Sequence, residues 1–484
     1  MSQKLVIDPV TRVEGHGKVT VHLDENNQVE DAQFHIVEFR GFERFIQGHP
    51  YWEAPVLVQR LCGICPVSHH LGAAKAMDQI VGLDPKDLSL PTQKIRKLLH
   101  FGQVFQSHAL HFFYLASPDL LFGTNSDPLK RNVIGVAMEY PELAKKGILM
   151  RKFGQEIIKM IAGKRIHGIA TTPGGVHKTI TVKERAYFLD GKDIPSIDTM
   201  IEWSLEILDF LKAYHINNKE FLDTFAKYPS GHLGLVNKEN GFLELYDGHL
   251  RAMDSEGNIT LPDVASNDYN QYFYESVEKW TYLKFPYLKH LGREKGWNRV
   301  GPLARLNICD GIETPLAEQE RQDFKAVTNG AINNMTMHTH WARLIEILYC
   351  AEMMKKLIED DDILSNDLIR KGERRNEGIG IIEAPRGTLI HHYEVDDKDR
   401  ITRCNLIVST THNNEPMNQA VRWVANNVLN GKTEITEGMM NQVEVAIRAY
   451  DPCLSCATHA MGQMPFELQL FDHLGNLIQE KIRY

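Results

Sequence analysis

The chain has 484 residues, 43% of them hydrophobic and 24% charged, and a formal net charge of −9, which is ordinary for a large globular protein. This acidic balance, without a basic stripe, argues against a nucleic-acid partner, and no apolar run approaches the roughly 18 residues of a transmembrane segment. Seven cysteines, four of them in Cys-x-x-Cys pairs, and a start without the apolar segment of a signal peptide predict a cytoplasmic protein that binds a metal rather than one held by disulfides.

The first predicted element is a β-hairpin, because apolar residues alternate over residues 18–23 and again up to residue 39. Just before it lies the segment DPVTRVEGH at residues 8–16, in which Glu14 alone suggests an ordinary loop ion pair with Arg12. Just after it lies RGFE at residues 40–43, in which Glu43 alone suggests a surface residue.

The segment RLCGICPVSH at residues 60–69 places two thiols and an imidazole close together, and DPCLSCATH at residues 451–459 repeats the pattern near the chain's end. Cys-x-x-Cys spacing lets both sulfurs of a tight turn face one ion, and thiolates favour zinc, iron-sulfur clusters, nickel or low-spin iron. A structural four-cysteine zinc site is the plain alternative. The fused Asp-Pro and the separation by most of the chain argue against it.

Helical spacing predicts a long buried helix over residues 91–116, with His108 and His111 as core residues. From about residue 141 to 372 the pattern is mostly helical, for example over 201–214 and 340–357. Alternation returns at residues 388–395 and 400–408, which predicts a second hairpin, and again at 466–470, which suggests a terminal strand. Three further cysteines are predicted to be buried small hydrophobes: Cys309, Cys350 and Cys404.

We therefore expect an α+β, mainly helical fold, with a central bundle of long helices and β-hairpin regions at about 4–45 and 380–412 around a helical core at about 50–375. No repeat or linker marks a domain boundary inside residues 1–459.

Both cysteine motifs, with their flanking Arg60, His69, Asp451 and His459, resemble those of the large, catalytic subunit of nickel-iron hydrogenases. The resemblance extends over essentially the whole chain and implies the reaction H₂ ⇌ 2H⁺ + 2e⁻. It further implies that Cys62 and Cys453 bind nickel alone, while Cys65 and Cys456 bridge nickel to an iron carrying cyanide and carbon monoxide.

The same resemblance implies roles for residues outside the cysteine motifs. Glu14 would accept the proton that leaves a nickel-bound thiolate, a task that needs a carboxylate within hydrogen-bond reach. Arg386 would hang over the two metals, with Asp119, Asp451 and Cys453 as further catalytic residues. The cofactor-binding residues would be Pro385, His16 and His69, with Thr410 or Ser409 donating to a cyanide.

A magnesium ion would be held by Glu43, the backbone carbonyl of Leu406 and His459, since hard oxygen ligands suit it. His16 and His69 would face an iron-sulfur cluster carried by a small partner subunit. Residues 460–484 would be a maturation extension, so that the chain is a precursor. Chaperones would assist, and a protease would cut after His459.

Within the family the chain looks most like the soluble, bidirectional NAD-linked type. It has no glycine-rich dinucleotide fingerprint, so NAD and FMN would bind to diaphorase partners. The alternatives are cytoplasmic relatives linked to coenzyme F420 or heterodisulfide reductase, a hydrogen sensor, and the metal-free quinone-side subunit of respiratory complex I. Retention of all four cysteines argues against the last of these.

Overall fold

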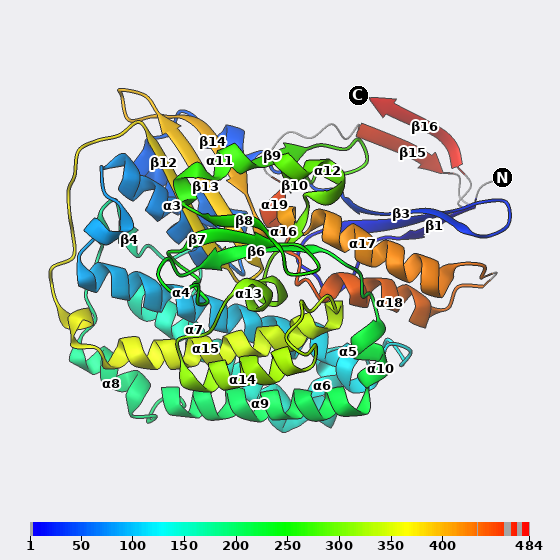
Figure 1. Ribbon diagram of the computed structural model, residues 1–484, viewed down its shortest axis with the longest axis horizontal. Helices are drawn as coiled ribbons and strands as arrows, with labels where there is room; N and C mark the ends of the chain where they lie inside the picture. The colour runs from blue at the N-terminus through cyan, green and yellow to red at the C-terminus, as the bar shows by residue number, and fades with distance from the viewer. Residues whose placement is uncertain (1–2, 433, 459–465, 472–476, 484) are drawn as a thin grey trace.

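Long helices make up the largest part of the computed structural model, which describes residues 3–432, 434–458, 466–471 and 477–483. They pack on one another in the lower half of Figure 1. The main members are α4 (Leu90–Leu110), α7 (Pro141–Ala162), α9 (Ile197–Asn217), α14 (Pro315–Ala326) and α15 (Thr339–Glu359). The three predicted helices are thereby confirmed, each with bounds close to those expected.

The helix α4 shows why this part of the chain is helical. Ser89 stands at its N-cap and Pro91 in its first turn, where a missing N–H costs nothing. The helix runs on through a π-helical turn (His111–Ala116) into α5 (Ser117–Phe122). The ring of Phe105 meets that of Phe153 of α7 edge-on, with centroids 6.2 Å apart. His108 and His111 are fully buried and hydrogen-bonded, as expected of core residues.

Two three-stranded antiparallel sheets contain the predicted hairpins. The N-terminal sheet has the order β1 (Gln3–Ile7), β2 (Gly17–Leu23), β3 (Val29–Ile36), so that the predicted hairpin gains a third strand. The other has the order β12 (Glu377–Ala384), β13 (Gly387–Val395), β14 (Ile401–Ile407). The fold is α+β and mainly helical, as predicted.

A four-stranded sheet lies within the region that the sequence pattern indicated to be mostly helical. Its order is β11 (Asn298–Arg299), β6 (Gly231–Val236), β7 (His249–Met253), β8 (Ile259–Val264). Five of the six residues of β6 are buried, so the strand lacks the alternation that marks a half-exposed strand. Short buried apolar runs cannot be told from buried helix by their period alone, which is why this sheet was missed.

N-terminal and C-terminal segments of the chain pack against each other. Helix α3 (Pro66–Ile80) packs against β12 and β13, and α17 (Asn414–Val424) packs against β3. Figure 1 shows this as blue and orange elements interleaved in the upper half of the molecule. The predicted terminal strand is confirmed as β15 (Phe466–Phe471), which pairs with β16 (Leu477–Arg483).

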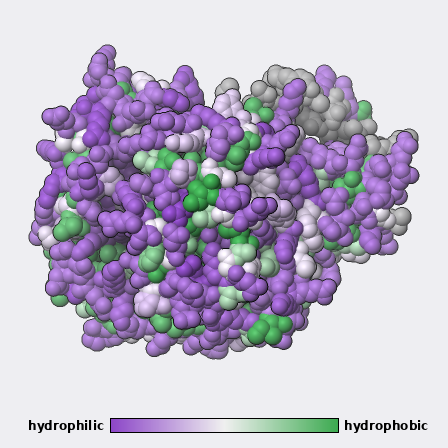
Figure 2. Space-filling model, in the orientation of Figure 1, coloured by the Kyte–Doolittle hydropathy of each residue, from purple (hydrophilic) through white to green (hydrophobic). Residues whose placement is uncertain are grey.

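The surface seen in Figure 2 is mostly hydrophilic, with small scattered hydrophobic spots. Among the described residues, no helix is both long and apolar enough to cross a membrane.

Candidate metal centre

The two Cys-x-x-Cys motifs meet in the interior. The Sγ atoms of Cys62 and Cys453 lie 3.3 Å apart, those of Cys65 and Cys456 3.5 Å apart, and all four lie within 4.8 Å of one another. None is in a disulfide, and each residue is at most 5% exposed. Four buried, converging thiols are a donor set for a soft metal ion.

Helix N-termini position two of these thiols. Cys65 stands at the N-cap of α3, and Cys453 at that of α19 (Leu454–Ala457). The N-terminal loop holds α19 in place, because the amide of Leu454 donates to the carbonyl of Glu14 over 2.9 Å. This loop and both cysteine segments therefore converge on one point.

The pKa values of the thiols are shifted in different directions. Hydrogen bonds from the other thiols lower the pKa of Cys62, whereas burial raises the pKa values of Cys453 and Cys456. Burial makes four free thiolates costly, and a bound cation offsets that cost because it stabilises the deprotonated form. The residues present thus fit a thiolate-bound metal centre.

Glu14 lies beside the four thiols. Its Oε2 accepts from the Sγ of Cys453 and from the backbone N–H of Ser455, both over 3.1 Å. The carboxylate is therefore within hydrogen-bond reach of one thiol and partly shielded from water.

Arg386 lies in the turn between β12 and β13 and is 3% exposed. It donates from Nε to the Asp451 carbonyl over 2.5 Å and from Nη2 to Asp451 Oδ1 over 3.0 Å. Burial disfavours the guanidinium's charge, but attraction by Asp451 and the thiolates outweighs it and raises the Arg386 pKa well above its usual value. Burial raises the pKa of Asp451 to about 6, against the attraction of Arg386.

A cavity of about 10 Å³, roughly the space of one water molecule, adjoins the thiols. Its walls come from α3, the turn after β12 and the start of α16 (Ser409–His412). They include Cys65, His69, Pro385, Arg386, Ser409, Thr410, Cys453 and Cys456.

Two hydroxyls in this wall differ in their bonding. Ser409 donates to the Gly387 carbonyl over 2.6 Å. Thr410 accepts from the backbone N–H of Cys453 over 3.0 Å, so its own O–H is left to donate elsewhere.

Asp119 is buried in a network of arginines: its carboxylate pairs with Arg12 at 2.5 Å and with Arg448 at 3.0 Å. It does not line the cavity beside the thiols. Glu43 and Leu406 are together, since the amide of Leu406 donates to Glu43 Oε1 over 2.8 Å. His459, the third expected magnesium ligand, lies outside the described residues.

The two histidines expected to face a partner's cluster have different surroundings. The side chain of His16 is 68% exposed and lies 2.5 Å from Glu38. His69 is only 1% exposed, and its Nδ1 lies 3.2 Å from Nε2 of His391. The ring of His69 lies inside this chain, because β13 covers the start of α3.

The matching family model, described as nickel-dependent hydrogenase, covers residues 40–127 and 247–459, and one described as HoxL-like covers residues 4–39. The chain belongs to the nickel-dependent hydrogenase family. Within this family it is 49% identical to the NAD-reducing hydrogenase HoxS subunit beta of Cupriavidus necator, over 100% of both chains. It is 41% identical to a chain of the F420-non-reducing hydrogenase vhc of Methanococcus voltae, over 96% of each.

Solved structures agree with this assignment. A crystal structure of an NAD⁺-reducing [NiFe]-hydrogenase in the H₂-reduced state matches with a TM-score of 0.91 and 51% identity, covering 94% of this chain and 99% of that one. A [NiFeSe]-hydrogenase of Dm. baculatum has a TM-score of 0.75 at 22% identity, covering 95% of this chain and 100% of that one. The second match shows that the fold is shared.

Sequence reasoning gave no role to Arg40, which ties the two cysteine segments of this hydrogenase together. Its guanidinium donates to the carbonyls of Leu61 and Arg60 over 2.7 and 3.0 Å, and its amide donates to the Thr458 carbonyl over 2.9 Å. The only signal was its place directly before Gly41 in the RGFE segment.

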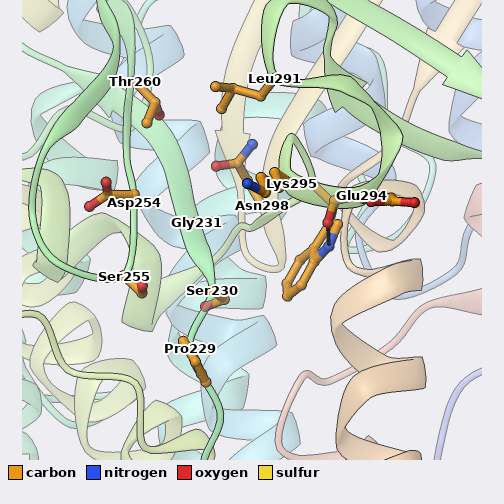
Figure 3. Close-up of a pocket in the computed structure, with 11 residues that line it drawn as sticks. Pro229, Ser230, Gly231, Asp254, Ser255, Thr260, Leu291, Glu294, Lys295 and Asn298 are labelled. Carbon is orange, nitrogen blue, oxygen red and sulfur yellow. Dashed lines mark hydrogen bonds between the residues drawn. The ribbon is translucent and has the colours of Figure 1, made fainter.

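A separate surface pocket of about 270 Å³ lies where β6 meets the residues around α12 (Gly292–Lys295) (Figure 3). Asp254, Glu294 and Lys295 are among the side chains drawn there. None of its lining residues is a predicted site residue.

Proposed function

We propose that this chain is the catalytic subunit for reversible hydrogen oxidation, H₂ ⇌ 2H⁺ + 2e⁻, at a nickel-iron centre. The observation that carries the proposal is the convergence of four buried thiols in a member of the nickel-dependent hydrogenase family. Cys62 and Cys453 would bind nickel, and Cys65 and Cys456 would bridge nickel to iron. When bound, the two metals would supply the place where hydrogen is split into two protons, which leave in turn, and two electrons.

The protein's own contribution is to receive and move the proton. Cys453 Sγ is the first acceptor, and Glu14 Oε2 is 3.1 Å away, so one transfer carries the proton from the thiol to a carboxylate. Arg386, held by two hydrogen bonds to Asp451, fixes a positive charge beside the thiolates and disfavours their protonation by bulk water.

The ligands on iron would be cyanide and carbon monoxide. Thr410 is our choice for the cyanide donor, because Ser409 already donates to the Gly387 carbonyl. Pro385 forms part of the apolar wall beside these ligands. A magnesium ion held by Glu43, the Leu406 carbonyl and His459 would stabilise the closed site.

Electrons would pass through a small iron-sulfur subunit to diaphorase subunits that carry FMN, and from these to NAD. The support is the 49% identity to a subunit of an NAD-reducing hydrogenase. The alternative is a link to heterodisulfide reductase or coenzyme F420. The 41% identical relative is F420-non-reducing, so it gives the F420 link no support. A reducing cytoplasm suits seven unpaired cysteines. Maturation chaperones and a C-terminal protease would complete the enzyme.

Elemental analysis of the purified complex tests the proposal. We expect one nickel and one iron for each chain outside the partner's clusters, infrared bands of bound carbon monoxide and cyanide, and hydrogen-dependent dye reduction. Zinc in place of nickel, or no dye reduction, would contradict it.

A Cys65→Ser variant sharpens the test. An alcohol of high pKa is a poor ligand for two soft metals, so nickel content and activity should be lost together. Cys404→Ser is the matched control, because Cys404 is also buried but outside the cluster, and it should retain both. Normal nickel content and turnover in Cys65→Ser would exclude Cys65 as a bridging ligand.

A further inference from the structure

Behind the metal centre lies a buried arginine that none of the roles above uses. Arg305 is on α13 (Pro302–Ile308) and is fully buried. It donates from Nε and Nη2 to the two carboxylate oxygens of Glu346, both over 2.6 Å, and from Nη1 to Glu383 Oε2 over 2.8 Å. A guanidinium has five N–H bonds, so two remain after these three.

The remaining two N–H bonds go to the backbone next to Arg386. Nη1 donates to the Ala384 carbonyl over 3.0 Å, and Nη2 donates to the Pro385 carbonyl over 3.2 Å. Pro385 and Arg386 are the whole turn between β12 and β13. Arg305 thus hydrogen-bonds the backbone carbonyls of the two residues that immediately precede Arg386.

The same helix also touches the turn through its backbone. Gly301, at the N-cap of α13, has φ +97°, and a Cβ there would lie 2.9 Å from the Arg386 carbonyl oxygen. The turn is therefore held on one side by a helix end and the Arg305 guanidinium, and Arg386 reaches Asp451 on the other side. A two-residue turn has little slack, so a shift at Pro385 moves Arg386.

We propose that Arg305 is a positioning residue for Arg386: it fixes the β12–β13 turn so that the Arg386 guanidinium stays beside the thiols. This inference rests on the function proposed above. Displacing a reacting group by about 1 Å can lower a rate by about two orders of magnitude. A satisfied buried network that borders the turn is the kind of support that holds such a group still.

Arginine is needed in this position because of its shape. Its rigid planar guanidinium donates to both oxygens of one carboxylate and to two carbonyls at once, whereas a lysine ammonium has three donors at a single point. Burial raises the pKa of Glu383 to about 6, and Arg305 acts against this, so the two carboxylates and the guanidinium form one coupled charge group. His108 completes it with Nε2 2.8 Å from Glu346.

A double-mutant cycle in the complete enzyme complex tests the proposal, with hydrogen-dependent dye reduction per nickel atom as the readout. Arg305→Lys should retain nickel but lower turnover roughly ten- to a hundredfold. Arg386→Lys should lower turnover by itself, and adding Arg305→Lys to it should lower turnover further by less than about threefold. Residues that act independently give multiplied losses, and residues that act through one another do not.

Arg96→Lys is the matched control, because Arg96 is also fully buried and donates to a carboxylate, Asp78, and to two backbone carbonyls, those of Thr172 and Gly175. It should lower the unfolding temperature but leave turnover per nickel within about twofold of wild type. An equal loss of turnover in Arg96→Lys would mean that any damaged buried arginine slows the enzyme, and it would overturn the proposal.

Two further outcomes decide the matter. Multiplied losses in the cycle, with active wild-type enzyme, overturn the positioning role and leave the proposed function intact; an inactive, nickel-free wild type refutes the function itself. If Arg305→Lys loses nickel, the same cycle uses Glu383→Gln, which removes the negative charge that pairs with Arg305 Nη1 and weakens the hold on Arg305. If the turnover losses of Glu383→Gln and Arg386→Lys multiply in that cycle, the positioning role is also overturned.

Discussion

At the scale of single residues, the site depends on which side chains meet the thiols and at which atoms. Glu14 meets Cys453 on one side, and Arg386 with Asp451 approaches from another. The carboxylate can accept a proton, and the buried guanidinium keeps its own. The proposed roles of proton removal and charge stabilisation thus fall to different residues, and single substitutions can separate them.

Glu14→Gln should leave the metals in place but lower turnover by about two to four orders of magnitude. The amide has almost the same shape, but it does not accept a proton at neutral pH. Conversion of para-hydrogen to ortho-hydrogen should suffer less than dye reduction, because it needs only reversible cleavage at the centre and no exchange of protons with water. Nickel analysis and both assays on one preparation check this.

Glu38→Gln is the control for this prediction. Glu38 also contacts Ser455, at its hydroxyl, and its other oxygen pairs with His16 rather than with a thiol. It should retain most of the turnover. If Glu14→Gln turned over like wild type in both directions, another residue would have to take the proton from Cys453.

At the scale of elements, the site is built where the loop before β2 packs on α19. Gly15 has φ +85°, a conformation that favours glycine, and a Cβ there would lie 2.8 Å from the Cβ of Leu454. This close approach lets Glu14 pair with Cys453 as an isolated β-bridge. A very short contact between two loops therefore sets the geometry of half the cysteine cluster.

Gly15→Ala should destabilise the protein by more than about 1 kcal/mol and lower nickel retention, because the methyl group forces α19 away from the loop. Gly48→Ala is the matched control: Gly48 has φ +88°, but a Cβ there meets nothing within 4 Å. It should show only the conformational strain, with normal nickel content. Thermal unfolding and metal analysis of both variants decide the point, and equal behaviour would refute the packing argument.

At the scale of the whole molecule, burial of many polar groups makes stability depend on pH. Burial lowers the pKa values of several fully buried histidines to about 3 or 4: His70, His100, His108, His232, His340 and His412. Their folded pKa values lie below the unfolded value of about 6.5, so the unfolded chain binds more protons between the two. The stability they support is complete above pH 6.5 and is lost as the pH falls.

We expect the free energy of unfolding to fall between pH 7.5 and 5.5 by about 1 kcal/mol for each such histidine. His412→Phe tests the assignment, since His412 Nε2 has no hydrogen-bond partner and burial is the one cause of its shift. Over this range the free energy of unfolding of the variant should fall by about 1 kcal/mol less than that of wild type. Denaturant titrations at both pH values measure the difference, and an unchanged pH dependence would count against it.

The remaining prediction concerns residues 460–484. The nickel-dependent hydrogenase model ends its match at residue 459, where the resemblance implies cleavage. We predict that active enzyme lacks the β15–β16 hairpin, whose strands both lie beyond that residue. Intact-mass measurement of active protein checks this. Full activity in protein whose every molecule still ends at Tyr484 would rule the cleavage step out.

The metal-binding character of this protein could be predicted from its sequence, because two Cys-x-x-Cys motifs with their flanking residues are local patterns. The sequence also predicted the long helices, whose periodicity survives over many turns. It did not reveal strand β6, because a strand buried on both faces shows no alternation.

Contacts between distant residues could be identified only in the tertiary structure. Glu14 contacts Cys453, and Arg305 hydrogen-bonds the backbone just before Arg386. Both contacts join segments far apart in the chain, and no spacing rule encodes them. The same holds for His69, whose ring is covered by β13. Burial and hydrogen-bond partners are set by packing, and packing depends on the whole chain at once.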